Sequence, residues 1–103
     1  MNRVQEAIAA AGRRGDLAFV PFLVLGDPDL ATSLRLIEAL VAAGADALEL
    51  GLPFSDPPAD GPVVQAADLR ALAAGTTPPA AFLLLDDVKK RWNIPVSLLI
   101  YYN

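Results

Sequence analysis

The chain places a lone glutamate inside an apolar run and two aspartates in the turn-rich segment that follows. Glu49 lies in the run Ala47–Leu50, and Asp56 and Asp60 come next, among prolines and glycine. Side chains alternate along a strand, so Glu49 would share its face only with the small residues Ala47 and Gly51. No basic residue stands nearby in the sequence, and a buried unpaired carboxylate holds its proton to a higher pH. These features predict a general acid that works near neutral pH.

Each of these carboxylates also has a purely structural explanation. An isolated glutamate such as Glu49 more often caps a neighbouring helix or pairs with an arginine than carries a function. Asp56 precedes a proline and Asp60 precedes a glycine, and both dipeptides are typical of turns. No glycine-rich phosphate-binding pattern follows an expected strand. The position of these residues in the fold must therefore decide between the two explanations.

Strand-like and helical patterns alternate along the chain. Apolar runs of strand length cover residues 17–25, 47–50 and 95–101. Apolar residues at helical spacing predict helices over about 4–11, 30–41 and 63–73, and Thr77 followed by Pro78 predicts the start of another. We expect Pro28 to be the first residue of the second helix, where its missing N–H donor would be unpaired in any case.

The alternation of strands and helices predicts a parallel sheet with right-handed crossovers. A doubly wound sheet and a (β/α)8 barrel both satisfy this pattern, and in both the chemistry occurs at the C-terminal ends of the strands. Asp27, the segment 49–60 and residues 101–103 all fall at such ends. We therefore expect the candidate site residues to gather on one side of the sheet.

The composition excludes several classes of function. A chain of 103 residues that is 54% hydrophobic fits one globular domain, or part of one. The net charge of -4, without any lysine or arginine stripe, argues against binding to nucleic acid. The chain has no cysteine and no histidine, so any metal would have to rest on carboxylates alone. The longest apolar run is too short for a membrane span, and we expect a soluble cytoplasmic protein.

Three stretches of the chain closely resemble the first part of the tryptophan synthase alpha chain family. They are "VPFLVLGDPD" from Val20, the segment 44–75 with "ELGLPFSDPPADGP", and "IPVSLLIYYN" at 94–103. The resemblance implies an α/β fold of the (β/α)8 TIM-barrel type, with residues 1–103 as the N-terminal part of a single domain. It also implies a lyase of tryptophan biosynthesis, which cleaves indole-3-glycerol phosphate to indole and glyceraldehyde 3-phosphate by a retro-aldol reaction.

The resemblance implies roles for individual residues. Glu49 corresponds to the general acid and base at the indole ring carbon and the side-chain hydroxyl. Asp60 corresponds to the second catalytic carboxylate, which interacts with the indole nitrogen from a mobile loop. Phe22, Ile100 and Tyr102 correspond to positions that line the indole pocket. No metal or cofactor is expected in this subunit.

The partner that the resemblance implies is the tryptophan synthase beta chain. In the family that chain holds pyridoxal phosphate and joins the alpha chain in an alpha2beta2 tetramer. Asp56 and Pro57 correspond to the loop that docks on it. The chain departs from many family members at Val24 and Val63, where those members have threonine, and at Pro58, where they have an aliphatic residue.

The length of the chain suggests that the barrel is incomplete. A (β/α)8 barrel takes about 250 residues, and its phosphate site is built by the loops after the seventh and eighth strands. We therefore expect the 103-residue chain to have no lyase activity on its own. The alternative is a non-catalytic interaction module, which would dock on a beta chain through the loop around Asp56 or self-associate to complete its core.

Overall fold

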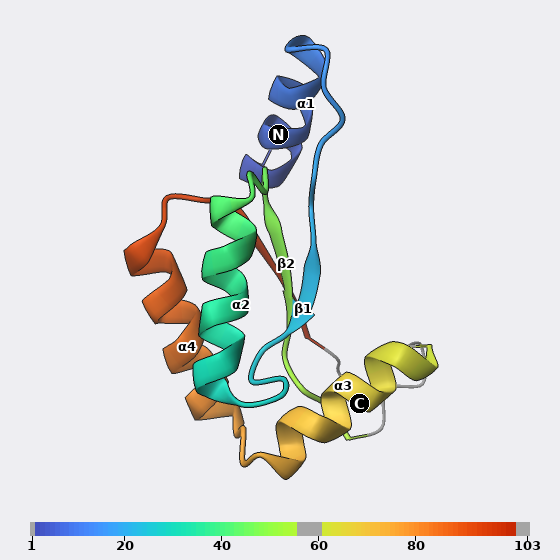
Figure 1. The fold of residues 1–103 in the computed structure, drawn as a ribbon, viewed down its shortest axis with the longest axis vertical. Coiled ribbons are helices and arrows are strands. Elements are labelled where there is room, and N and C mark those ends of the chain that lie inside the picture. Colours follow the sequence, from blue (N-terminus) through green and yellow to red (C-terminus); the bar gives the residue numbers. More distant parts are fainter. Residues whose placement is uncertain (1, 56–60, 101–103) are drawn as a thin grey trace.

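The structure of the protein, a computed structural model, describes residues 2–55 and 61–100 (Figure 1). Strands and helices alternate along this part of the chain, except that two helices separate the second and third strands. The elements are α1 (Arg3–Arg13), β1 (Phe22–Val24), α2 (Leu30–Ala42), β2 (Leu48–Gly51), α3 (Pro62–Ala73), α4 (Pro78–Arg91) and β3 (Val96–Leu99).

The three strands form one parallel sheet with β2 in the middle. The register pairs Phe22 of β1 with Glu49 of β2, and Glu49 with Ser97 of β3. A hydrogen bond of 2.9 Å from Leu25 N to Gly51 O continues the pairing of β1 and β2 past the end of β1. The parallel sheet predicted from the alternation of strands and helices is thus confirmed.

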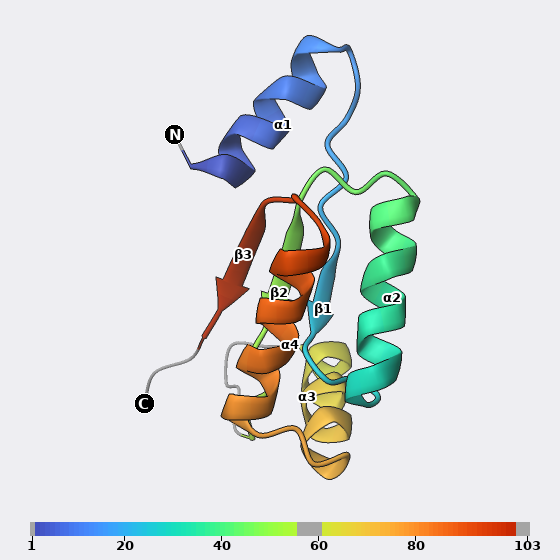
Figure 2. The ribbon, with the colours of Figure 1, turned by 90° about the vertical axis from the view of Figure 1, so that its left-hand side faces the viewer.

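Helices α2 and α4 pack together and cover one face of this sheet (Figure 2). The core between the sheet and these helices consists of buried apolar side chains from both layers. Its members are Leu25, Ile37, Leu48, Leu50, Ala81, Leu84 and Val88. Burial of apolar surface is the main favourable term in folding, so this face holds the sheet and helices together. The opposite face, which we call the open face, carries the exposed side chains of Glu49, Ser97 and Leu99.

Side-chain caps set the starts of α2 and α4. The Oδ1 atom of Asp29 accepts a hydrogen bond from Thr32 N at 2.8 Å. The Oγ1 atom of Thr77 accepts one from Ala80 N at 3.3 Å. Such acceptors satisfy backbone donors that the first helical turn leaves unpaired. The start of α4 at Pro78 confirms the prediction made from Thr77 and Pro78.

The predicted start of α2 is wrong by two residues. The helix begins at Leu30, because Asp29 takes the cap position and also accepts a hydrogen bond from the Thr32 hydroxyl at 2.9 Å. Pro28 lies in the turn before this cap, after a cis peptide bond with Asp27. Asp29 was the stronger signal for the helix start, because its carboxylate accepts a hydrogen bond from an unpaired backbone N–H of the first turn, which a proline cannot do.

The apolar run 17–25 forms a shorter strand than predicted. Only Phe22–Val24 is strand, and Leu17 is 95% exposed. Pro21 has no N–H to donate to a ladder, although Phe19 O and Pro21 O accept hydrogen bonds from Asp46 N at 2.8 Å and Glu49 N at 2.9 Å. Phe19 N donates a hydrogen bond of 2.8 Å to Asp46 Oδ2. β2 and β3 each begin one residue later than predicted, and α1 ends at Arg13, two residues past the predicted end.

Helix α1 lies at the N-terminal ends of the strands and α3 at their C-terminal ends (Figures 1 and 2). Arg14, just after α1, donates from Nη2 to Asp46 Oδ1 at 3.1 Å and so ties α1 to the start of β2. Trp92, the only tryptophan of the chain, follows α4 and packs against the core on the helix side of the sheet. These three residues line a cavity of about 410 Å³ beside α1.

Candidate active site

A row of side chains crosses the open face of the sheet. The ladder register places Phe22, Glu49 and Ser97 side by side on β1, β2 and β3. Residues that are paired across a parallel ladder point to the same face. The flanking residues Leu48 and Leu50 are buried in the core on the other face. The sheet therefore brings Phe22 and Glu49 together, as the site prediction requires.

Glu49 lies on this face but is exposed, which corrects the prediction of a buried carboxylate. The prediction rested on the small neighbours Ala47 and Gly51, which leave space beside the side chain. In the structure α2 and α4 cover the other face, and α3 covers the open face only near Val24 of β1, so the space beside Glu49 is open to solvent. Among the described residues, no arginine or lysine forms an ion pair with Glu49. Within that part of the chain, the arginine-pair explanation for Glu49 therefore finds no support.

Gly51 makes room for the aromatic ring of Phe22. A Cβ atom at Gly51 would lie 3.0 Å from Phe22 Cζ and 3.3 Å from Phe22 Cε2, which is tighter than ordinary van der Waals contact. The ring therefore lies across the backbone of β2, close to the strand that carries Glu49, and Phe22 remains 36% exposed. An exposed aromatic surface beside a carboxylate suits a flat apolar ligand that carries a polar group.

Strand β3 contributes Leu99 to the open face. Leu99 pairs with Gly51 and is 44% exposed, whereas Leu98 pairs with Leu50 and packs against the core. Ile100, the predicted pocket residue, follows the last residue of β3, lies outside the ladder and is half-buried. Sequence reasoning missed Leu99 because an alternating pattern shows which residues share a face, but not which face of the sheet is covered.

Four of the predicted site residues lie outside the described part of the chain. They are Asp56, Pro57, Asp60 and Tyr102. The description resumes at Gly61, which is the N-cap of α3, and Pro62 takes the first helical position, where proline is favoured. α3 thus begins two residues after Asp60 in the sequence.

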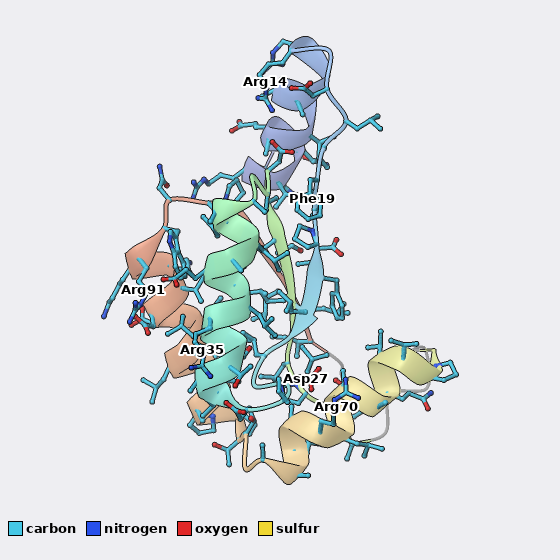
Figure 3. All side chains as sticks on the ribbon, viewed as in Figure 1. Arg14, Phe19, Asp27, Arg35, Arg70 and Arg91 are labelled. Carbon is cyan, nitrogen blue, oxygen red and sulfur yellow. The ribbon has the colours of Figure 1, made fainter. Side chains whose placement is uncertain are left out.

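A polar cluster at the end of β1 was not predicted from the sequence. Arg70 of α3 donates from Nε to Asp27 Oδ1 at 2.8 Å and from Nη2 to Asp27 Oδ2 at 3.1 Å (Figure 3). These hydrogen bonds, together with the charge of Asp27, raise the pKa of the Arg70 guanidinium above its ordinary value. Asp27 lies at a strand end, as expected, but both of its carboxylate oxygens accept hydrogen bonds from Arg70. No local pattern could reveal a partner so distant in the sequence.

The described residues hold neither a carboxylate cluster that could bind a metal ion nor a membrane-spanning helix. In residues 2–55 and 61–100, no three acidic side chains gather closely enough to hold a metal ion. No helix in this part of the chain is long and apolar enough to cross a bilayer.

The sequence matches a known family over nearly its whole length. The family model described as "Tryptophan synthase alpha chain" matches residues 8–103. The chain belongs to the tryptophan synthase alpha chain family. A tryptophan synthase alpha chain from Shewanella amazonensis is 55% identical to it over 106 residues, and one from Methanothermobacter thermautotrophicus is 61% identical over 92 residues. The alignments cover 100% and 88% of this chain, but only 39% and 34% of those relatives.

Solved structures of tryptophan synthase share the fold. The alpha chain from Legionella pneumophila matches with a TM-score of 0.85 at 34% identity, over 99% of this chain and 38% of its own. A tryptophan synthase a2b2 complex from Pyrococcus furiosus matches with a TM-score of 0.77 at 40% identity, over 84% of this chain and 34% of that one. The predicted fold class is confirmed: these parallel strands and helices form part of the (β/α)8 TIM barrel of tryptophan synthase alpha chains.

Proposed function

We propose that this member of the tryptophan synthase alpha chain family supplies the catalytic carboxylates that cleave indole-3-glycerol phosphate to indole and glyceraldehyde 3-phosphate in tryptophan biosynthesis. The observation that carries the proposal is the position of Glu49 on the open face of β2, next in the ladder to Phe22. This position lies within the family match over residues 8–103. On the basis of the family match, we propose that the reaction takes place in the cytoplasm.

The retro-aldol reaction needs two proton transfers, and Glu49 is the group proposed for both. The bond between the third carbon of the indole ring and the glycerol side chain breaks once that ring carbon has gained a proton. The side-chain hydroxyl loses its proton as the aldehyde forms. A carboxylate on a strand keeps a fixed direction toward both atoms, which favours its use as acid and then as base.

Asp60 is proposed to stabilise the positive charge that develops on the indole nitrogen. Protonation of the ring carbon makes the ring nitrogen cationic, and a carboxylate placed beside it lowers the energy of that state. Asp60 directly precedes Gly61, the N-cap of α3. Two carboxylates at separate places in the chain can thus act on two different atoms of one ring.

The apolar part of the ring is proposed to bind against Phe22, Ile100 and Tyr102. The support on the open face is the ring of Phe22, which the lack of a side chain at Gly51 allows to lie close to β2. Leu99, which pairs with Gly51, extends the same apolar surface across to β3. Aromatic and aliphatic walls with few polar groups are typical of sites for flat ligands.

The 103-residue chain is proposed to be inactive without the rest of a barrel. The chain spans 39% of the length of its Shewanella relative. In such barrels the phosphate-binding loops follow the seventh and eighth strands, and the described part of this chain has three strands. Glu49 without a phosphate anchor cannot hold the substrate in a reactive position.

The tryptophan synthase beta chain is the proposed partner. The support is the family match, together with the Pyrococcus structure, whose title names an a2b2 complex. Asp56 and Pro57 are the residues proposed to dock on the beta chain, in an alpha2beta2 assembly. Pyridoxal phosphate would belong to that chain, and no cofactor is proposed for this one.

A second candidate function is a non-catalytic module that self-associates or docks on a beta chain. The exposed apolar side chains of Phe22 and Leu99 on the open face favour it, since such surfaces tend to become covered. Light scattering after size-exclusion chromatography, with and without a beta chain, tests this candidate. A monodisperse species that co-elutes with the beta chain would support the module, and aggregation without co-elution would exclude it.

A chimera tests the catalytic proposal. Residues 1–103 would replace the matching first part of the Shewanella amazonensis alpha chain, and indole release from indole-3-glycerol phosphate would be measured. We expect an active chimera that loses at least about 100-fold in kcat on Glu49→Gln, a typical contribution of a general acid or base. The matched control is Glu38→Gln, the same change at an exposed glutamate of α2, which should leave kcat unchanged. A folded but inactive parent chimera would refute the proposal.

A further inference from the structure

Helix α3 buries little apolar surface compared with its neighbours. Its buried residues are Asp68 and Ala71, whereas α4 buries Ala81, Leu84 and Val88. At the start of α3, Val63 is 81% exposed. Most helices in proteins are held by the packing of an apolar face, so the placement of α3 must depend on other contacts.

One of these contacts joins α3 to the end of β1. Both oxygens of Asp27 accept hydrogen bonds from Arg70, at 2.8 and 3.1 Å, so that the planar guanidinium and the planar carboxylate meet edge to edge. The side chain of Asp27 is largely buried and that of Arg70 is about half exposed. Exposed ion pairs usually contribute little, but a bidentate arginine–carboxylate pair is the exception, because its geometry is fixed.

A second contact supports the same attachment. Thr76, which follows α3, is 2% exposed and is seated against Gly26 in the turn after β1. A Cβ atom at Gly26 would overlap the Thr76 side chain, and the φ angle of Gly26 is +87°, so only glycine fits there. Gly26 N in turn donates to the buried Ser33 Oγ of α2 at 3.1 Å. The turn that carries Asp27 is therefore itself fixed to α2.

We propose that Asp27 and Arg70 form a positioning pair, which fixes α3 across the C-terminal end of β1 and so sets the position of its N-cap Gly61, the residue that follows Asp60 in the sequence. Neither residue touches a reacting atom. The proposal rests on the proposed function for the role given to Asp60. The pair requires arginine, because the single nitrogen of a lysine cannot engage both carboxylate oxygens in the same plane.

Hydrogen exchange of the backbone amides in α3 tests the positioning pair in the purified 103-residue chain. Asp27→Asn removes the charge without altering α3 itself. We expect the exchange of residues 64–73 to rise roughly twofold to fivefold, while α2 and α4 keep their protection, because a local attachment opens locally. Arg70→Lys should act in the same direction, and the exchanged pair Asp27→Arg with Arg70→Asp should restore part of the protection.

The matched control is Arg91→Lys. Arg91 is about as exposed as Arg70 and donates to Asp87 at 2.9 Å, but both residues belong to α4, so no second element is attached. Exchange in α3 should not change in this variant. Unchanged exchange of α3 in both Asp27→Asn and Arg70→Lys would overturn the proposal. An equal rise in α2, α3 and α4 would do the same, since it would show general destabilisation.

The chimera supplies a readout that general destabilisation would not give. There we expect Asp27→Asn to lower kcat for indole release severalfold with little change in KM, because positioning of the loop carboxylate acts on the transition state rather than on substrate binding. An inactive parent chimera would refute the proposed function while the exchange experiment still decides the positioning of α3. A higher KM with an unchanged kcat would overturn the positioning role.

Discussion

Gly51 determines how closely the ring of Phe22 can approach strand β2. The ring lies where a side chain at Gly51 would begin, with Phe22 Cζ 3.0 Å from the site of a Cβ atom. The two residues are therefore coupled: one lacks a side chain where the other places an aromatic ring. On the open face this coupling keeps the aromatic surface next to the strand that carries Glu49.

Gly51→Ala should lower the free energy of unfolding by about 1 kcal/mol, because overfilling a packed contact displaces the ring. In a Phe22→Ala background the same change should cost almost nothing, since the ring is no longer there. Urea denaturation of the four proteins measures this coupling. An equal effect of Gly51→Ala in both backgrounds would contradict the contact. Gly12→Ala, with no atom within 4 Å of the added methyl group, is the control and should not destabilise.

At the residue scale, the sequence predicted which carboxylate belongs to the sheet but not its surroundings. The alternation along 47–51 correctly separated Glu49 from Leu48 and Leu50. Its exposure could not be predicted, because burial depends on which elements cover each face. Leu99 was missed for the same reason. Arg70 was missed because its partner Asp27 lies 43 positions away, beyond any local pattern.

Individual elements depend on a few polar contacts at their ends. Helix α2 starts at the Asp29 cap, and the start of β2 is tied to α1 and to the chain before β1 by Asp46. These contacts satisfy backbone donors or pair charges where the regular hydrogen-bond ladders stop. They are therefore the places where one substitution should loosen an entire element.

The Asp29 cap should make the stability of α2 depend on pH. Hydrogen bonds from the Thr32 backbone and hydroxyl hold the pKa of Asp29 below the ordinary value of 3.8. A carboxylate whose pKa is lowered by folding stabilises the fold above its unfolded pKa, and this contribution disappears as the pH falls through the folded pKa. The melting temperature of Asp29→Ala should thus fall short of the parent at pH 7 and approach it below about pH 3.8. A gap that widens on acidification would contradict this account.

Asp46→Ala should lower the free energy of unfolding by about 1–3 kcal/mol, because it leaves Phe19 N without its acceptor and removes the ion pair with Arg14. Asp46→Asn should cost less, since it keeps an acceptor. Asp16→Ala is the control: Asp16 pairs with the same arginine at 3.4 Å, but both of these side chains are exposed, and we expect a change within about 0.5 kcal/mol. Chemical denaturation ranks the three variants, and an equal loss for Asp16→Ala and Asp46→Ala would contradict the role of the Asp46 contacts.

At the element scale, the kinds of element were predictable and their ends were less so. Apolar spacing located the helices, and Thr77 with Pro78 gave the start of α4 correctly. The start predicted at Pro28 was wrong because Asp29, one residue later, caps the helix. The run 17–25 predicted too long a strand because apolar character alone does not supply ladder hydrogen bonds, and Pro21 has no N–H to donate.

In the molecule as a whole, the sheet has one face covered by α2 and α4 and one largely open face, which α3 covers only at Val24 of β1. The family and fold class could be inferred from the sequence, because the motif around Glu49 is specific and the alternation of elements is regular. The distribution of exposed surface could not be inferred, because it depends on how much of the barrel the chain provides: it spans 39% of its Shewanella relative. β1 and β3 are the outer strands of the described sheet, and outer strands favour association.

Leu99→Asp should reduce self-association of the purified chain, because it places a charge on the open face. Leu83→Asp is the matched control: Leu83 is a still more exposed leucine, but it lies on α4, away from the open face. Sedimentation velocity at several concentrations measures the effect. Equal effects of the two substitutions would show that association does not use the open face.

The fluorescence of Trp92 can report the folding of the chain. It is the only indole group in the sequence and packs on the helix side of the sheet, whereas Glu49 and the ring of Phe22 lie on the opposite side. Tryptophan fluorescence would therefore report whether the helix-covered layer is folded, from a position that a ligand on the open face does not touch. The folding of this layer can thus be followed without a label.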